Sequence, residues 1–123
     1  TPEDFFTDPR VEGPKFGSKK PVYVLAGGGT FSAAEEFAYN LQSLKRAQIV
    51  GEDTGGGAHP GGSAPLPYGL SIRVPSGRAI NPITKTNWEQ TGVRPDVPVA
   101  ADQALEAAHK LALERVTAAR SVQ

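Results

Sequence analysis

Apolar residues in this chain occur both in short continuous runs and at helical spacing, and together these patterns predict an α/β fold. Residues 21–26, PVYVLA, form a β-branched and aromatic run, which is typical of a strand buried on both faces. The stretch from about 31 to 45 repeats apolar side chains at helical spacing: Phe37, Ala38, Leu41 and Leu44. Residues 48–51 then begin a second short apolar run. A strand, a helix and a strand in so few residues predict a βαβ unit with parallel strands.

The remainder of the chain predicts loops, one further strand and a closing helix. Residues 51–62, GEDTGGGAHPGG, contain six glycines and indicate a loop. Residues 70–74 alternate as a half-exposed strand does, whereas 75–98 are irregular and rich in proline. A last helix is expected from about 102 to 119. Its predicted buried stripe consists of Ala104, Leu105, Ala108, Leu111 and Ala112.

Composition narrows the possible functions. With 123 residues the chain is long enough for one domain, which we place at 21–123 behind an arm or linker at 1–20. Thirteen basic and thirteen acidic residues are interspersed, which argues against a nucleic-acid partner. No apolar run approaches the roughly 20 residues of a membrane span. Cysteine is absent, and we expect neither a metal nor a cofactor.

The run AGGGTFSAAEEF, residues 26–37, carries the candidate chemistry. In a structural interpretation, Ser32 and Glu35 form an S-x-x-E capping box at the helix start, with Thr30 as a rival cap. In a functional interpretation, Ser32 is a nucleophile at the positive end of a helix, and the backbone N–H of Ala33 stabilises an oxyanion. A phosphate-binding loop is a third interpretation, although neither common glycine-rich phosphate motif is present.

Three runs, TFSAAEEFAYNL, VGEDTGGGAHPGG and NWEQTGVRPD, resemble the tail-specific, or C-terminal processing, serine proteases. The resemblance is strongest to the branch that includes interphotoreceptor retinoid-binding protein repeats, and it covers roughly 20–113. It implies the βαβ core of a ClpP/crotonase-like protease domain, a peptide or protein substrate, and a periplasmic or secreted location. The family's protease core begins before residue 21, and methionine is absent here. We therefore expect a C-terminal portion that is incomplete or weakly active in isolation and whose missing N-terminal half is a partner, with a homo-oligomer as a further possibility.

The resemblance also implies site residues. The family's nucleophile matches Ser32, and Ala33 matches an oxyanion donor through its backbone. The family's lysine matches Gly57, so a serine–lysine dyad is absent. A related branch, the tricorn-type proteases, has a glutamate before a G-V-x-P-D run, and Glu89 occupies that place here.

The general base is the open question of this sequence. His59 lies on the loop where the family has its lysine, and imidazole has a suitable pKa, so His59 is the candidate base. A loop histidine bonded to backbone is the alternative, and His109 is expected on a helix surface. Gly56, Gly57 and Trp88 are candidate substrate-cleft residues, although a lone tryptophan also suits the core.

Two functions compete for this sequence. The first is a serine peptidase that hydrolyses peptide bonds through Ser32. The second is a non-catalytic module that binds retinoid, fatty acid or peptide on the same fold.

Overall fold

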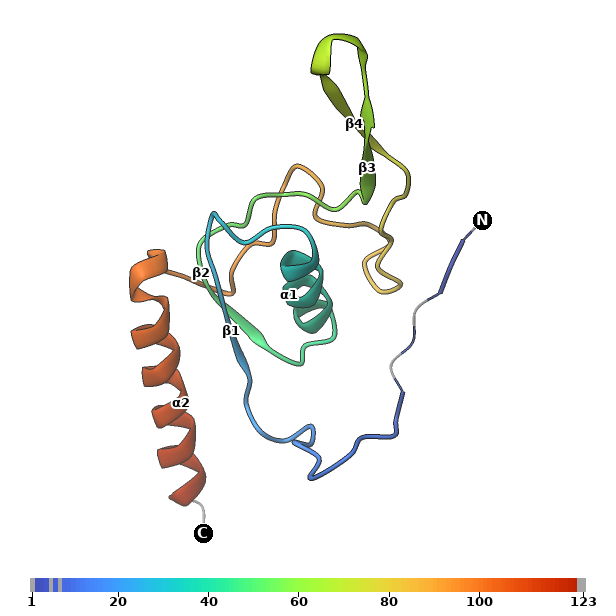
Figure 1. Cartoon of the computed structure of the whole chain (residues 1–123). Coiled ribbons are helices and arrows are strands. Elements are labelled where there is room, and N and C mark those ends of the chain that lie inside the picture. The colour runs from blue at the N-terminus through green and yellow to red at the C-terminus, as the bar shows by residue number, and fades with distance from the viewer. Residues whose placement is uncertain (1, 5, 7, 122–123) are drawn as a thin grey trace.

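The computed structural model describes residues 2–4, 6 and 8–121, so residues 1, 5 and 7 of the expected arm lie outside it. A parallel sheet lies between two helices, and a hairpin projects from this body (Figure 1). The elements are β1 (Tyr23–Ala26), α1 (Ala33–Ser43), β2 (Gln48–Gly51), β3 (Gly61–Pro65), η1 (Pro67–Gly69), β4 (Ser71–Pro75), β5 (Val97–Pro98), η2 (Ala101–Gln103) and α2 (Ala104–Arg120).

The predicted βαβ unit is present, and the fold is α/β. β1 pairs with β2 in parallel, from Tyr23 opposite Gln48 to Ala26 opposite Gly51. β5 adds a third parallel strand beside β2, so the order is β1-β2-β5. The sequence-based expectation of an irregular segment through residue 98 is wrong for β5. This strand has only two residues, Val97–Pro98, too few to show a period.

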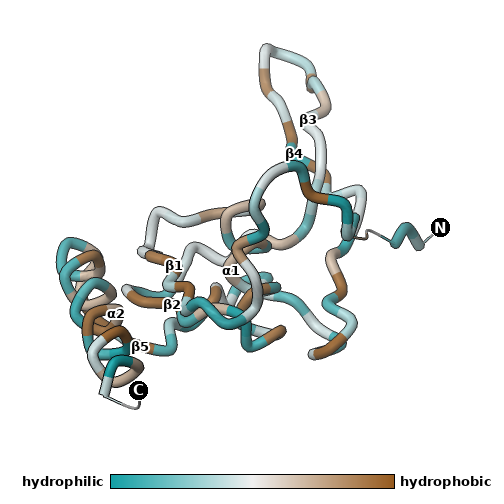
Figure 2. The backbone as a smooth tube through the Cα atoms, turned by 90° about the horizontal axis from the view of Figure 1, so that it is seen from below, coloured by the Kyte–Doolittle hydropathy of each residue, from teal (hydrophilic) through white to brown (hydrophobic). Residues whose placement is uncertain are grey.

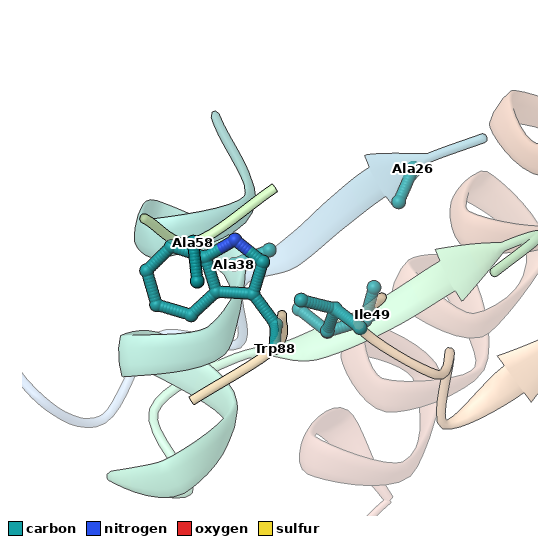
Figure 3. Close-up of a cluster of buried hydrophobic side chains, with 6 residues drawn as sticks. Ala26, Ala38, Ile49, Ala58 and Trp88 are labelled. Atoms are coloured by element: carbon teal, nitrogen blue, oxygen red, sulfur yellow. The ribbon is translucent and has the colours of Figure 1, made fainter. Parts of the chain in front are cut away.

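The core has two halves, one on each face of the sheet. Ile49 and its neighbour Val50 point to opposite faces, as successive strand residues do. On the α1 side, Ile49 packs with Ala38 and Trp88 (Figure 3). On the α2 side, the buried residues are Val50, Ala104 and Ala108.

Several apolar residues that were expected in the core are exposed. Leu25 of β1 is 44% exposed, so β1 is not buried on both faces; it is an edge strand of this sheet. Leu105 of α2 is 69% exposed, because α2 turns Ala104 and Ala108 toward the sheet instead. Phe37 of α1 and Leu44, which follows the end of that helix, are also exposed. Within the described residues, no helix is both long and apolar enough to cross a membrane.

β3 and β4 form an antiparallel hairpin in which Ala64 lies opposite Ile72. The hairpin stands clear of the body in Figure 1, and all of its β4 residues are exposed. Its apolar positions in Figure 2 are therefore on the surface. The sequence predicted β4 near its observed bounds but assigned Gly61 and Gly62 of β3 to a loop.

Candidate functional site

Ser32 lies where the chain leaves β1 and enters α1. Three glycines follow Ala26 and lead to Thr30, whose hydroxyl accepts a hydrogen bond from the N–H of Gly27 at 3.1 Å. The N–H of Thr30 donates to the carbonyl of Gly27 at 2.8 Å. These two bonds close a tight turn at the carboxyl edge of the sheet, and the turn brings Ser32 to the start of α1.

The backbone of Ser32 has an unusual conformation, with φ at 56° and ψ at −120°. Positive φ is sparsely populated by residues that have a Cβ, and such strain costs about 1–3 kcal/mol. The residue is nevertheless exposed to solvent. The strained conformation therefore leaves an accessible hydroxyl at the N-terminal end of α1, where the helix dipole is positive.

Ser32 and Glu35 form a capping box, in which the side chain of each residue faces the backbone N–H of the other. The N–H of Ser32 donates to Glu35 Oε2 at 2.8 Å, and the N–H of Glu35 donates to the carbonyl of Ser32 at 2.9 Å. In the described part of the chain, the Ser32 hydroxyl makes no hydrogen bond of normal geometry at the cap. The N–H of Ala33 likewise has no acceptor among the described residues. Neither the hydroxyl proton of Ser32 nor the amide proton of Ala33 thus has an acceptor among the described residues.

Glu35 is completely buried and ties the start of α1 to the glycine-rich loop. Its Oε1 accepts hydrogen bonds from the Thr54 hydroxyl at 2.5 Å and the Gly56 N–H at 2.7 Å, and its Oε2 accepts from the Gly57 N–H at 2.9 Å. Burial, the largest single influence, raises the pKa of this carboxyl, but the hydrogen bonds that it accepts together hold the pKa below its usual value. Glu35 is therefore ionised at neutral pH. Sequence reasoning treated Glu35 only as a capping partner and missed Thr54.

Glu89 holds the next part of the same loop. Its Oε2 accepts hydrogen bonds from the N–H of Ala58 at 2.7 Å and of His59 at 3.0 Å. Its Oε1 lies 3.7 Å from His59 Nδ1, and both side chains are 30% exposed. The chain around Glu89 runs alongside the loop, because the N–H of Gln90 donates to the carbonyl of Gly56 at 2.9 Å. The structure thus brings Glu89 and His59 together.

Every backbone N–H from Gly55 to His59 has an acceptor. Gly55 donates to the carbonyl of Thr30 at 3.0 Å, and the four that follow donate to Glu35 and Glu89. The loop amides are therefore not available to stabilise an oxyanion, whereas the amide of Ala33 is.

The position of the Phe31 ring explains why residues 55 and 57 are glycines. A Cβ on Gly55 would lie 2.7 Å from Phe31 Cδ2, and a Cβ on Gly57 would overlap the Phe31 ring. The ring itself is 56% exposed. A side chain as large as lysine has no room at 57 while Phe31 holds this position.

Other candidates lie elsewhere. Trp88 is only 3% exposed and contacts Tyr39 at a ring-centroid distance of 5.4 Å, so the prediction that it walls a substrate cleft is wrong. The indole is large and apolar enough to fill the space between α1 and the sheet. His109 is exposed on α2. Among the described residues, Ser32 Oγ makes no hydrogen bond to His59 or Glu89, and no group of three His, Asp or Glu side chains is arranged to hold a metal ion.

Comparisons with known proteins point to one family. The model of peptidase family S41 matches residues 3–99. A photosystem II D1 C-terminal processing protease is 33% identical, with a TM-score of 0.58 over 69% of this chain and 22% of that one. A Parabacteroides merdae protein described as a candidate peptidase is 31% identical, with a TM-score of 0.64 over 76% and 32%. Mature CPAF complexed with lactacystin is 25% identical, with a TM-score of 0.62 over 85% and 21%. This chain spans about a fifth to a third of the length of these structures.

Proposed function

Because the chain belongs to peptidase family S41, we propose that it carries the nucleophile of a serine peptidase and that Ser32 is that nucleophile. One observation carries this proposal. Ser32 is exposed at a strained turn between a buried sheet and a helix N-terminus, and no hydrogen bond of normal geometry at the cap engages its hydroxyl. A serine that served only as a cap would need neither the strained backbone nor a solvent-exposed position.

The oxyanion of a tetrahedral intermediate fits beside Ala33. Its N–H follows directly after the nucleophile and has no acceptor among the described residues. A preorganised donor at this position stabilises negative charge as it develops on the substrate carbonyl oxygen, and the helix dipole adds to this effect.

His59 is the proposed general base, and Glu89 is the residue that orients it. Glu89 binds the His59 backbone N–H and lies 3.7 Å from His59 Nδ1. A carboxylate beside Nδ1 favours the tautomer in which Nε2 is free to accept a proton. The Phe31 ring leaves no room for a basic side chain at position 57, so the general base must come from another residue. This supports the assignment of His59.

The reaction then follows the general course of acyl transfer. His59 Nε2 accepts the Ser32 proton as Oγ attacks the peptide carbonyl, and the oxyanion forms opposite the Ala33 N–H. The C–N bond breaks, and the protonated His59 gives its proton to the leaving amine. Water, deprotonated by His59, hydrolyses the ester on Ser32 and restores both groups. The Ser32–His59 hydrogen bond that this step requires forms with substrate in place, since catalytic hydrogen bonds often tighten only when substrate is bound.

A fluorophosphonate probe tests this proposal. We expect covalent labelling that mass spectrometry locates on Ser32 and that is lost in Ser32→Ala. Ser43→Ala, a change at the other end of the same helix, is the matched control and keeps the label. His59→Gln slows labelling by about 100-fold or more, because a serine needs a positioned base.

Two outcomes would contradict the proposal. Labelling that persists in Ser32→Ala would place the nucleophile elsewhere. A folded chain that is never labelled but binds retinol or a fatty acid tightly would favour the non-catalytic binding module.

A further inference from the structure

The Phe31 ring is the most exposed apolar feature next to the proposed nucleophile. It precedes Ser32 in the chain and is 56% exposed, although aromatic rings are usually buried. One face of the ring packs on the backbone of Gly55 and Gly57, where any Cβ would collide with it. The ring is therefore fixed from below by the loop and open to solvent above.

The chain around this ring contains no charge. Neither residues 27–34 nor residues 54–58 include an acidic or basic side chain. The carboxylate of Glu35 lies beneath the surface, and the hydrogen bonds that it accepts balance its charge. The five N–H groups from Gly55 to His59 are also occupied, so the loop offers few free polar donors. This surface suits an apolar group and disfavours a charged one.

We propose that Phe31 and the backbone of Gly55–Gly57 form a specificity subsite for an apolar side chain of the peptide substrate, on the residue flanking the scissile bond. This inference rests on the proposed function, because it takes Ser32 as the attacking group. Phe31 adjoins Ser32 in the chain, so we place the side chain held on its ring on a substrate residue next to the attacked carbonyl. Burial of a large apolar side chain there contributes about 1.5–3 kcal/mol, which corresponds to roughly a 10- to 100-fold preference.

Two peptidyl phosphonates that differ only in having a benzyl or a methyl side chain test the subsite. The second-order rate constant for labelling is measured with each, and their ratio is compared between variants. We expect the benzyl probe to react about tenfold faster with the natural chain and this preference to disappear in Phe31→Ala. Phe31→Leu, which keeps a smaller apolar wall, gives an intermediate ratio. Phe37→Ala removes another exposed phenylalanine of α1, 58% exposed, and leaves the ratio unchanged.

A binding measurement separates failure of the subsite from failure of the proposed nucleophile. In Ser32→Ala, NMR titration compares capped, uncharged pentapeptides with phenylalanine or alanine at the central position. Tighter binding of the phenylalanine peptide, lost when Phe31→Ala is added, supports the subsite even if no phosphonate labels Ser32. Equal binding of the two peptides, no binding of either, or a preference that survives Phe31→Ala would overturn the inference.

Discussion

Glu35 joins two separate parts of the chain through one carboxylate. It accepts hydrogen bonds from Ser32 at the helix start and from Thr54, Gly56 and Gly57 in the loop. Thr54 extends the connection, because its hydroxyl also accepts the N–H of Val93 at 2.7 Å. The position of Ser32 relative to the loop therefore depends on a single buried charge.

Glu35→Gln should lower the free energy of unfolding at neutral pH by about 3 kcal/mol, because an amide NH₂ would face backbone donors in a buried site. The folded-state pKa of Glu35 is lowered, so its contribution is present above the usual glutamate pKa and is lost as pH falls through the lowered value. Urea denaturation at pH 7 and at about pH 3 should show the gap between the two proteins narrowing in acid. Glu36→Gln, one position along and exposed, is the control. A gap that is constant with pH would contradict the assigned ionisation.

The sequence predicted some residues of the proposed site and missed others for a physical reason. Ser32 was recognisable because strand, glycine and helix signals meet at it, and Glu89 because its run resembles a family motif. The hydrogen bonds from the loop to Glu35 could not be recognised in the sequence, because a partner such as Gly56 lies 21 positions away and donates only through its backbone. Backbone donors carry no signature in residue type.

At the scale of elements, the hairpin of β3 and β4 is the least integrated part of the fold. Two-stranded hairpins are marginally stable alone in water, and the residues of β4 are all exposed. Gly61 and Pro75 are register partners, so the hairpin can be cut short at its base. We expect replacement of 62–74 by Asn-Gly to change the free energy of unfolding by less than about 1 kcal/mol.

Urea unfolding followed by Trp88 fluorescence checks this expectation. Asn81→Ala is a useful comparison, because Asn81 is buried and donates to Asn40 Oδ1 at 2.9 Å. This single substitution should cost more than removal of the whole hairpin, at about 1–3 kcal/mol. The opposite ranking would show that the hairpin stabilises the body.

Elements differ in how well their sequence predicts them. α1 and α2 were found because their apolar residues repeat at helical spacing, and β1 and β2 because each is a short apolar run. β3 was missed because Gly61, Gly62 and Pro65 hide its strand character, and it exists only through pairing with β4. The exposure of Leu105 could not be foreseen either, since α2 has apolar residues on two sides and only packing selects one.

For the molecule as a whole, apolar surface is left open on the α2 side of the sheet. Leu25 of the edge strand and Leu105 of α2 line one groove there and are both substantially exposed. An open strand edge beside apolar side chains favours association with another chain. We expect light scattering to show a mass that increases with protein concentration.

The double change Leu25→Ser and Leu105→Ser should reduce this association. Tyr68→Ser, at a fully accessible position in η1 that is 99% exposed, serves as the comparison and should have a smaller effect. A wild-type chain that remains monomeric at its highest soluble concentration would show that this surface does not drive self-association.

The hydrogen bonds of the glycine-rich loop have one more consequence, which concerns its dynamics. Exposed loops without regular structure normally exchange their amide protons with deuterium quickly. Here every amide from Gly55 to His59 donates a hydrogen bond, and three of these amides belong to glycines, whose backbones are otherwise the freest to move. In exchange measured by NMR, the amides of Gly55 to His59 should therefore exchange more slowly than those of neighbouring residues. They should also exchange more slowly than the amides of the paired strands in the β3–β4 hairpin. Glu35→Gln should raise the exchange rates of these amides to those of an unprotected loop. The exchange rate of each amide in the natural chain would then report how often its hydrogen bond opens.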